Sequence, residues 1–177
     1  VGGDLPAIDP WGPAIPRGLA TKVYPCFYAL RRPISALAEL RDRIDPAKVT
    51  RIILRTPEAT VTPLIHKRPT TGLQAKFSLE YAAATALLDS HQGFASFTDN
   101  AAQRQNVRNI LELAEVQLTP GGDWLLAGEF EAEVYAGGQV FSIRSQFPFG
   151  SPQRPATPAQ LMAKVEDCLS GTSVIPE

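Results

Sequence analysis

The sequence predicts an α+β domain, in which a small antiparallel or mixed sheet of about four strands carries helices on one face. Apolar residues recur every three or four positions in several separate stretches, which is typical of helices packed on a core. Near the end of the chain, two alternating stretches flank Gly137-Gly138, which is typical of an antiparallel hairpin. Both periodicities occur within 177 residues, so one domain should contain helices and sheet together.

The first helix is predicted at 24–44, where the apolar positions share one face: Leu30, Ile34, Leu37, Leu40 and Ile44. Pro33 lies inside this stretch and should break or restart the helix, because proline has no amide hydrogen to donate. Ser35 and the charged residues of 39–43 are expected to point outward. Asp45-Pro46 ends the helix.

The first strand is predicted at 49–55, which is rich in β-branched residues and places Arg51 and Arg55 on a polar face. A loop follows that is punctuated by Pro57, Pro63 and Pro69. The next helix is predicted at 73–88, because its apolar residues share one face and its run of alanines has strong helix propensity.

A further helix is predicted at 104–114, and a short strand follows at 115–119. The hairpin strands are predicted at 129–135 and 139–146. In the first of them glutamates alternate with apolar residues, so one face of the sheet should be wet.

The last helix is predicted to follow Thr157, which can cap it, with Pro158 at its first position. Leu161, Val165 and Leu169 are expected to face inward. Cys168 lies among them and should be a buried small hydrophobe.

Composition limits the possible functions. The chain has 17 Lys and Arg residues against 18 Asp and Glu, which excludes the broad basic surface of a general nucleic-acid binder. No stretch approaches the roughly 18 consecutive apolar residues of a membrane span. Two cysteines, Cys26 and Cys168, are too few for a disulfide scaffold, so we expect a reducing, cytoplasmic location.

The two ends of the chain differ from its middle. Residues 1–19 are dense in glycine and proline, which predicts an irregular interdomain lead. A domain seldom opens with such a segment, so we expect this chain to be a piece of a longer protein, cut near a domain boundary. The domain itself is predicted at 20–170, with a tail at 171–177.

The common catalytic signatures are absent from the sequence. It holds no HExxH, CxxC or GxSxG motif and no glycine-rich phosphate-binding loop. Two histidines without an acidic cluster make a poor metal site. We therefore expect no structural metal.

Two basic clusters remain as candidates for chemistry. At 22–26, Lys22 could hold an anionic substrate or act as a base if desolvated, and Tyr24 could carry a proton. At 66–76, positive charge gathers near a helix N-terminus that Thr70 or Thr71 can cap. The basic residues of this second cluster are His66, Lys67, Arg68 and Lys76.

The second cluster suits a carboxylate-rich ligand, although each cluster can also be interpreted as an ordinary polar loop. Neither contains an obvious acid–base pair. Either another part of the protein completes the site, or the domain has no catalytic site.

The residues of both clusters resemble one family. The segment 22–26 (KVYPC) is similar to the KxYP signature of the MmgE/PrpD family, and the ungapped stretch 66–84 is similar to its most recognisable block. Phe97-Thr98-Asp99, the predicted helix at 104–113, and Lys164 with Cys168 follow in similar order. The resemblance extends over about residues 11–170 and indicates the C-terminal domain alone.

This resemblance implies a function. Family members act on small polycarboxylates without metal or organic cofactor, as 2-methylcitrate dehydratase, cis-aconitate decarboxylase or iminodisuccinate epimerase. A large N-terminal helical domain supplies much of the active site, a smaller α+β lid closes over it, and the proteins are typically homodimers. Lys22 corresponds to the active-site lysine. Where several members have a histidine shortly afterwards, this chain has Tyr28, Leu30 and Arg31.

The sequence thus predicts the lid of a dehydratase-like lyase, with Lys22 catalytic and with His66, Lys67, Arg68, Lys76 and Tyr24 binding substrate. The lid tyrosine that a decarboxylase has after the first strand is missing from Glu58-Ala59-Thr60-Val61, which weakens the decarboxylase interpretation. Two further interpretations stay open, an epimerase of the same family and a non-catalytic module for ligand binding or dimerisation.

Overall fold

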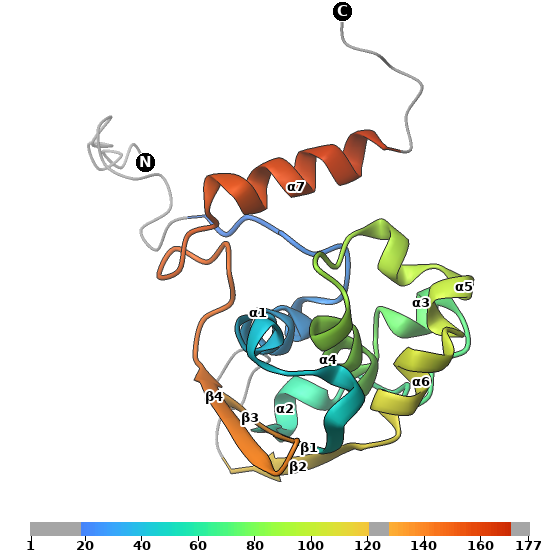
Figure 1. The fold of residues 1–177 in the computed structure, drawn as a ribbon. Helices are drawn as coiled ribbons and strands as arrows, with labels where there is room; N and C mark the ends of the chain where they lie inside the picture. Colours follow the sequence, from blue (N-terminus) through green and yellow to red (C-terminus); the bar gives the residue numbers. More distant parts are fainter. Residues whose placement is uncertain (1–18, 121–127, 171–177) are drawn as a thin grey trace, which may run out of the picture.

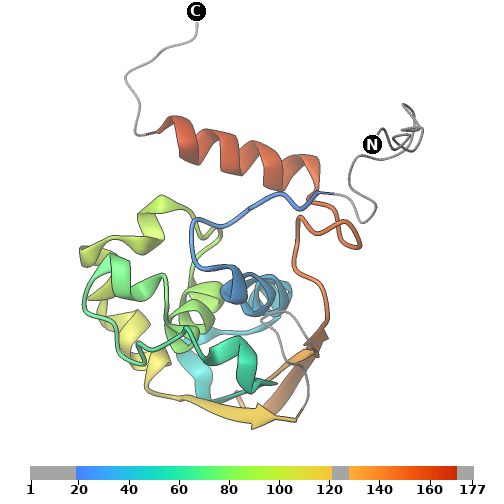
Figure 2. The same ribbon diagram turned by 180° about the vertical axis from the view of Figure 1, so that it is seen from behind.

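A four-stranded mixed sheet forms one layer of the domain, and the computed structural model describes residues 19–120 and 128–170. The strand order is β2-β1-β3-β4, where β1 is Val49–Pro57, β2 is Ala114–Thr119, β3 is Phe130–Ala136 and β4 is Gln139–Ser145. The helices lie on one side of this sheet in both views (Figure 1, Figure 2). The predicted α+β class is therefore confirmed.

Helices fill the chain between and around the strands. The α-helices are α1 (Arg31–Leu40), α2 (Glu58–Val61), α3 (Gly72–Ala75), α4 (Leu79–Leu88), α5 (Asp99–Ala102), α6 (Gln105–Leu111) and α7 (Pro158–Leu169). Short 3₁₀ turns lie at Tyr28–Leu30, Arg41–Arg43, Pro46–Lys48 and Phe94–Phe97.

The pairing of the strands follows from the connections between them. β1 and β2 pair in parallel, because the chain between them returns through the helices α2 to α6. β3 and β4 form the predicted antiparallel hairpin, in which Gly137 and Gly138 have φ of 57° and 77°. A tight turn of this kind needs positive φ, which glycine adopts without steric cost.

The two faces of the sheet differ as the alternating pattern predicts. The inner face packs on the helical layer and is buried at Ile52, Leu54, Phe130, Ala132 and Val134. The outer face carries ion pairs across the strands, with Arg51 2.6 Å from Glu115 and Arg55 2.8 Å from Glu133. The predicted wet face is confirmed.

The first helix starts later than predicted. A 3₁₀ turn at Tyr28–Leu30 precedes α1, and Pro33 lies in the first turn of α1, where its missing amide breaks no helical hydrogen bond. Ser35 does not point outward as expected. It is fully buried, and its hydroxyl accepts a hydrogen bond from the Phe149 amide at 3.0 Å.

The predicted helix at 73–88 is two helices. The chain turns at Lys76, and α4 starts again at Ser78, whose hydroxyl accepts a hydrogen bond from the Tyr81 amide at 3.2 Å. As a result Leu73 lies 70% exposed instead of sharing the buried face. The alanine-rich surface of α4 packs closely against α1, as its propensity and slim side chains allow.

The last helix begins where predicted but is not buried. Thr157 and Gln160 form a reciprocal capping box at the start of α7, and Pro158 follows the cap. The apolar residues expected to face inward are between 40% and 50% exposed, and Cys168 is exposed as well. α1 and α4 already pack on the sheet. α7 therefore lies outside the helical layer, at the edge of the domain (Figure 1).

One carboxylate ties α7 to the body. Asp167 accepts hydrogen bonds from the Phe94 amide at 2.9 and 3.1 Å. Within residues 19–120 and 128–170, no helix is long and apolar enough to cross a membrane.

Candidate functional site

Lys22 lies on an extended segment that leads into α1. Its side chain is exposed, while Val23, the next residue, is buried in the core. Among the described residues, the Lys22 side chain makes no hydrogen bond and no ion pair within 4 Å. The segment therefore anchors its backbone and leaves one ammonium group available for a ligand.

The buried thiol of Cys26 lies within electrostatic range of three cations. Cys26 is 2% exposed, and burial raises the pKa of its thiol to about 12. Lys22, Arg31 and Lys76 oppose this rise, because positive charge favours the thiolate. Residues 22 and 76 come from the two separate predicted clusters, and the fold places both within electrostatic range of one atom.

Contacts between the backbones of two segments hold this arrangement. The Phe27 amide donates a hydrogen bond to the Lys76 carbonyl at 3.1 Å, and the rings of Phe27 and Phe77 lie 5.3 Å apart. The His66 amide donates to the Phe77 carbonyl at 3.4 Å. His66 and Lys76, two of the predicted substrate-binding residues, are therefore neighbours of the Lys22 segment.

Tyr24 lies deeper than a freely exposed ligand contact. It is 6% exposed, and burial raises the pKa of its hydroxyl, although a hydrogen bond with Ser35 partly offsets the rise. Its part in substrate binding stays a prediction.

Lys67 and Arg68 face a different place. They line a cavity of about 460 Å³ together with Glu80, Glu112 and the start of β2. Arg68 forms an ion pair with Glu112. Glu80 is 8% exposed, and burial raises the pKa of its carboxyl, against the opposing charges of Lys67 and Arg68. The predicted basic cluster is thus divided between two surfaces.

Two backbone amides at the N-terminus of α3, near Thr71, already donate to protein groups. Thr71 caps α3 by accepting a hydrogen bond from the Gln74 amide at 3.3 Å. The Gly72 amide donates to Asp99 at 2.8 Å. These two amides are therefore not free to bind an anion, and the side-chain cations of this cluster remain as candidates.

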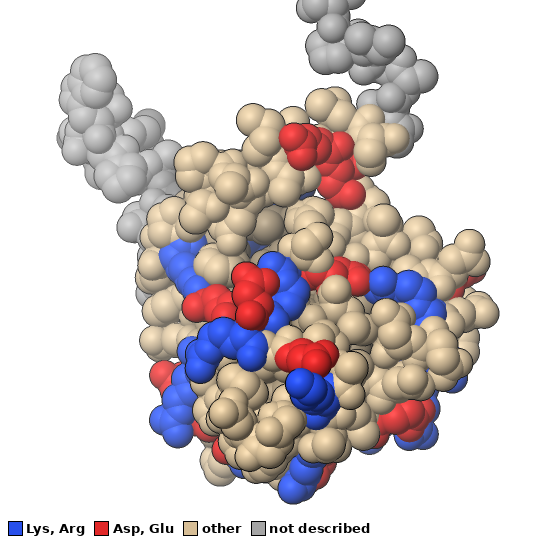
Figure 3. Space-filling view, in the orientation of Figure 1, with Lys and Arg blue, Asp and Glu red and all other residues tan. Residues whose placement is uncertain are grey.

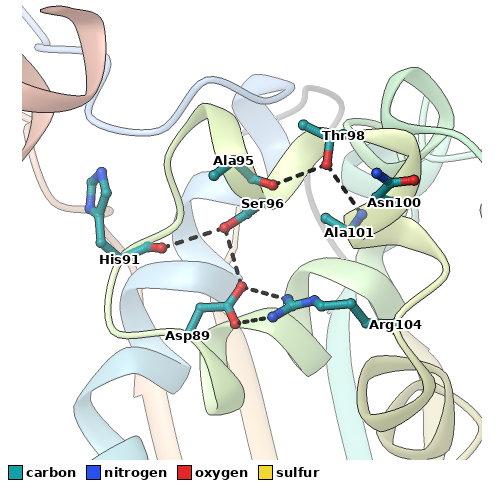
Figure 4. A pocket seen from close by; sticks show the side chains of 8 residues that line it. All are labelled: Asp89, His91, Ala95, Ser96, Thr98, Asn100, Ala101 and Arg104. Atoms are coloured by element: carbon teal, nitrogen blue, oxygen red, sulfur yellow. Dashed lines mark hydrogen bonds and ion pairs between the residues drawn. The ribbon is translucent and has the colours of Figure 1, made fainter. Parts of the chain in front are cut away.

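A second cavity, of about 400 Å³, is lined by a two-pronged ion pair between Arg104 and Asp89 (Figure 4). Both terminal nitrogens of Arg104 donate to the Asp89 carboxylate at 2.8 Å. The Ser96 hydroxyl donates to the same carboxylate at 3.2 Å. The His91 ring points away from this pair, while its carbonyl faces Ser96. The charges of Asp89 and Arg104 neutralise each other, although Arg104 Nε and His91 Nε2 have no hydrogen-bond partner in the described part of the chain. We assign this ion pair a structural role, because it joins the end of α4 to the residue that precedes α6.

Across the face shown in Figure 3, basic and acidic side chains are interspersed. Within residues 19–120 and 128–170, no group of three or more His, Cys, Asp or Glu side chains could hold a metal ion.

Sequence reasoning missed three of the residues described above. Arg31 is 1% exposed, although arginine on a surface helix is usually solvated. Asp89 and Arg104 are 15 residues apart, and only the tertiary fold joins them. The one available signal was the Arg31-Arg32 pair inside an apolar helical pattern, which is unusual if both residues are solvated.

The chain is similar to one known family of domains. The chain matches the family model of the MmgE/PrpD C-terminal domain over residues 24–175, and a search of curated proteins finds no match. The matched range contains both motif blocks except Lys22 and Val23, which lie just before it. It also covers most of the 177 residues. The chain therefore belongs to the MmgE/PrpD family and represents its C-terminal domain.

Proposed function

We propose that this domain forms the lid of a cofactor-independent lyase, which removes water from a small di- or tricarboxylate such as 2-methylcitrate. An N-terminal helical domain of the same protein would complete the active site, and the protein would act as a homodimer in the cytoplasm. Membership of the MmgE/PrpD family supports a dehydratase-like enzyme.

The observation that carries the proposal is the group of cations around Cys26. Lys22 and Lys76 have no acidic partner within 4 Å among the described residues, and Arg31 adds a third positive charge nearby. Unpaired ammonium groups suit a substrate with several carboxylates, because each ion pair replaces part of the hydration that the substrate loses.

The chemistry divides between the two domains. A base in the helical domain would take a proton from the carbon next to a carboxylate. The hydroxyl group on the neighbouring carbon would take up a proton from an acid in that domain and leave as water. Lys22 would stabilise the negative charge that develops on the carboxylate during proton removal. Closure of the lid would exclude water and strengthen this interaction.

Lys22→Ala in the full-length protein tests the proposal. Turnover of 2-methylcitrate, followed by absorbance of the unsaturated product, should fall about a hundredfold, which corresponds to about 3 kcal/mol of transition-state stabilisation. Lys22→Arg should restore only part of the rate, because a planar guanidinium cannot replace a compact ammonium in a fitted site.

Lys48→Ala is the matched control, because Lys48 is an exposed lysine that pairs with Asp45 at 3.5 Å in a turn. It should leave turnover unchanged. The 177-residue chain alone should show no turnover, since the base lies elsewhere. If Lys22→Ala retained most of the activity, the catalytic role of Lys22 would be wrong.

One observation favours a second candidate, a non-catalytic contact module. The exposed apolar residues of α7 form a surface suited to packing against another protein surface. If the full-length protein bound polycarboxylates without converting them by dehydration, epimerisation or decarboxylation, this module would replace the lyase as the assignment.

A further inference from the structure

Arg31 is a buried cation without an acidic partner among the described residues. Its terminal nitrogen Nη2 donates to the carbonyl oxygens of Thr21 and Phe149, the latter at 3.1 Å. The guanidinium also lies 4.6 Å from the centre of the Tyr28 ring. Burying a charge costs free energy unless polar contacts compensate for the lost hydration, and here the two carbonyl groups and the ring do so. The contact with Thr21 also fixes the backbone next to Lys22.

Gly150 also binds Thr21, through its carbonyl oxygen. The Thr21 amide donates to the Gly150 carbonyl at 2.8 Å, so both backbone polar groups of Thr21 are bound. Gly150 has φ of 83°, and a Cβ atom there would collide with the Thr21 carbonyl oxygen. It would also lie 3.0 Å from Val23 Cγ2 and 3.1 Å from Arg31 Nη2. Glycine is thus required both by conformation and by space.

The loop that carries Gly150 is itself fixed on α1. The Phe149 amide donates to the Ser35 hydroxyl at 3.0 Å. Arg154 lies 3.9 Å from the centre of the Phe149 ring and pairs with Glu39. The Gly150 amide donates to the Arg154 carbonyl at 2.9 Å. The position of α1 therefore determines the position of the loop and, through Gly150, that of Thr21.

We propose that Arg31 and Gly150 form a clamp that fixes Thr21 and thereby sets the position of the Lys22 ammonium group in the active site. Both are positioning residues, because neither is placed on the reacting atoms. The inference rests on the proposed catalytic role of Lys22. It gives the buried guanidinium of Arg31 a role in placing the exposed Lys22.

Gly150→Ala and Gly138→Ala form a matched pair of variants for the test. Both glycines have positive φ, so both substitutions strain the backbone, but a Cβ at Gly138 meets nothing within 4 Å. In the full-length protein, Gly150→Ala should lower kcat roughly ten- to a hundredfold through displacement of Lys22. Gly138→Ala should lower the melting temperature without changing kcat more than about twofold.

A second readout does not depend on activity. The rate at which acetic anhydride acetylates Lys22, measured by mass spectrometry of the native protein, should change at least about threefold in Gly150→Ala and stay unchanged in Gly138→Ala. Arg31→Lys keeps the charge but loses the grip on two carbonyl groups, so it should lower kcat about tenfold.

The outcomes separate the two proposals. If Lys22→Ala keeps its turnover, the proposed function of Lys22 fails, while the acetylation rates still decide whether the clamp exists. If Lys22→Ala abolishes turnover but Gly150→Ala behaves like Gly138→Ala in both readouts, the clamp is overturned. If Gly150→Ala does not fold, Arg31→Lys decides, and a kcat within about twofold of the unmodified protein contradicts the clamp.

Discussion

Two helices of this domain, α4 and α7, have apolar residues at helical spacing and a capping Ser or Thr, yet their burial is opposite. In α4 every residue from Leu79 to Leu87 is buried. In α7 no residue is buried, and Leu161, Met162, Val165 and Leu169 are at least 40% exposed. Apolar spacing therefore predicts a helix and its apolar face, but not whether the domain contains a surface to cover that face.

The contrast has a physical origin in composition. α4 is apolar or small on nearly all sides, so it can be surrounded by α1, α6 and the sheet. α7 has one polar face with Lys164, Glu166 and Asp167, so it can cover only one surface. Three experiments probe this contrast, in order of decreasing effect.

The same substitution in the two helices should give very different losses. Leu87→Ala, at a site 1% exposed, should lower the free energy of unfolding by about 2–5 kcal/mol, because it leaves a cavity in a packed core. Leu161→Ala, at a site 40% exposed, should lower it by less than about 1 kcal/mol. Urea denaturation of both variants measures the difference, and equal losses would mean that α7 is packed as tightly as α4.

The aspartates near the ends of the two helices should also differ. Asp89→Asn should lower the free energy of unfolding by about 1–3 kcal/mol, because it leaves the partly buried Arg104 guanidinium without its counter-charge. Asp167→Asn should cost less than about 1 kcal/mol, because an amide oxygen can still accept from Phe94. A loss for Asp167→Asn as large as that for Asp89→Asn, in thermal or urea unfolding, would contradict the ranking.

Burial of Cys26 in the body of the domain should make the stability depend on alkaline pH. Burial raises the pKa of Cys26 from 9.0 to about 12, so the folded state keeps a proton that the unfolded state loses first. Stability from this group is therefore complete below about pH 9 and is lost as the pH rises from 9 towards 12. The expected loss is about 1 kcal/mol by about pH 10.

Unfolding in urea at about pH 8, 9 and 10 measures this effect in two variants. Cys26→Ala should remove the part of the pH dependence that this thiol contributes, although it also lowers stability at every pH. Cys168→Ala is the control, because it removes an exposed thiol of α7 and leaves Cys26 in place. Identical slopes in the two variants would refute the assignment of the slope to Cys26.

The elements that sequence reasoning located are those whose signal is local. The alternation at 129–135 and the turn at Gly137-Gly138 predicted the hairpin to within about two residues, because strand period and turn conformation are set by neighbouring residues. The break at Ser78 was missed, since the apolar and alanine pattern continues across it. The burial of α7 was missed because it depends on a distant surface.

Parts of the candidate site could also be predicted, because their signal lies in short stretches of sequence. Lys22 and Lys76 belong to motif blocks that can be read in the sequence, although only the fold brings them towards Cys26. The contact between Arg31, Thr21 and Gly150 joins residues far apart in the chain, so no local pattern announces it. The tertiary fold also places Lys67 and Arg68 in one cavity with Glu80, on a different surface from Lys76.

The central place of β1 in the sheet has a consequence for synthesis on the ribosome. Ile52 pairs with Ala114 on one side and Val134 on the other, and both partners are translated much later. Until then, a strand rich in Ile and Leu has two free edges, which is the condition that favours aggregation of nascent chains. Late, long-range pairing also slows folding, so expression at reduced temperature or with a chaperone that shields nascent chains should increase the yield of correctly folded domain.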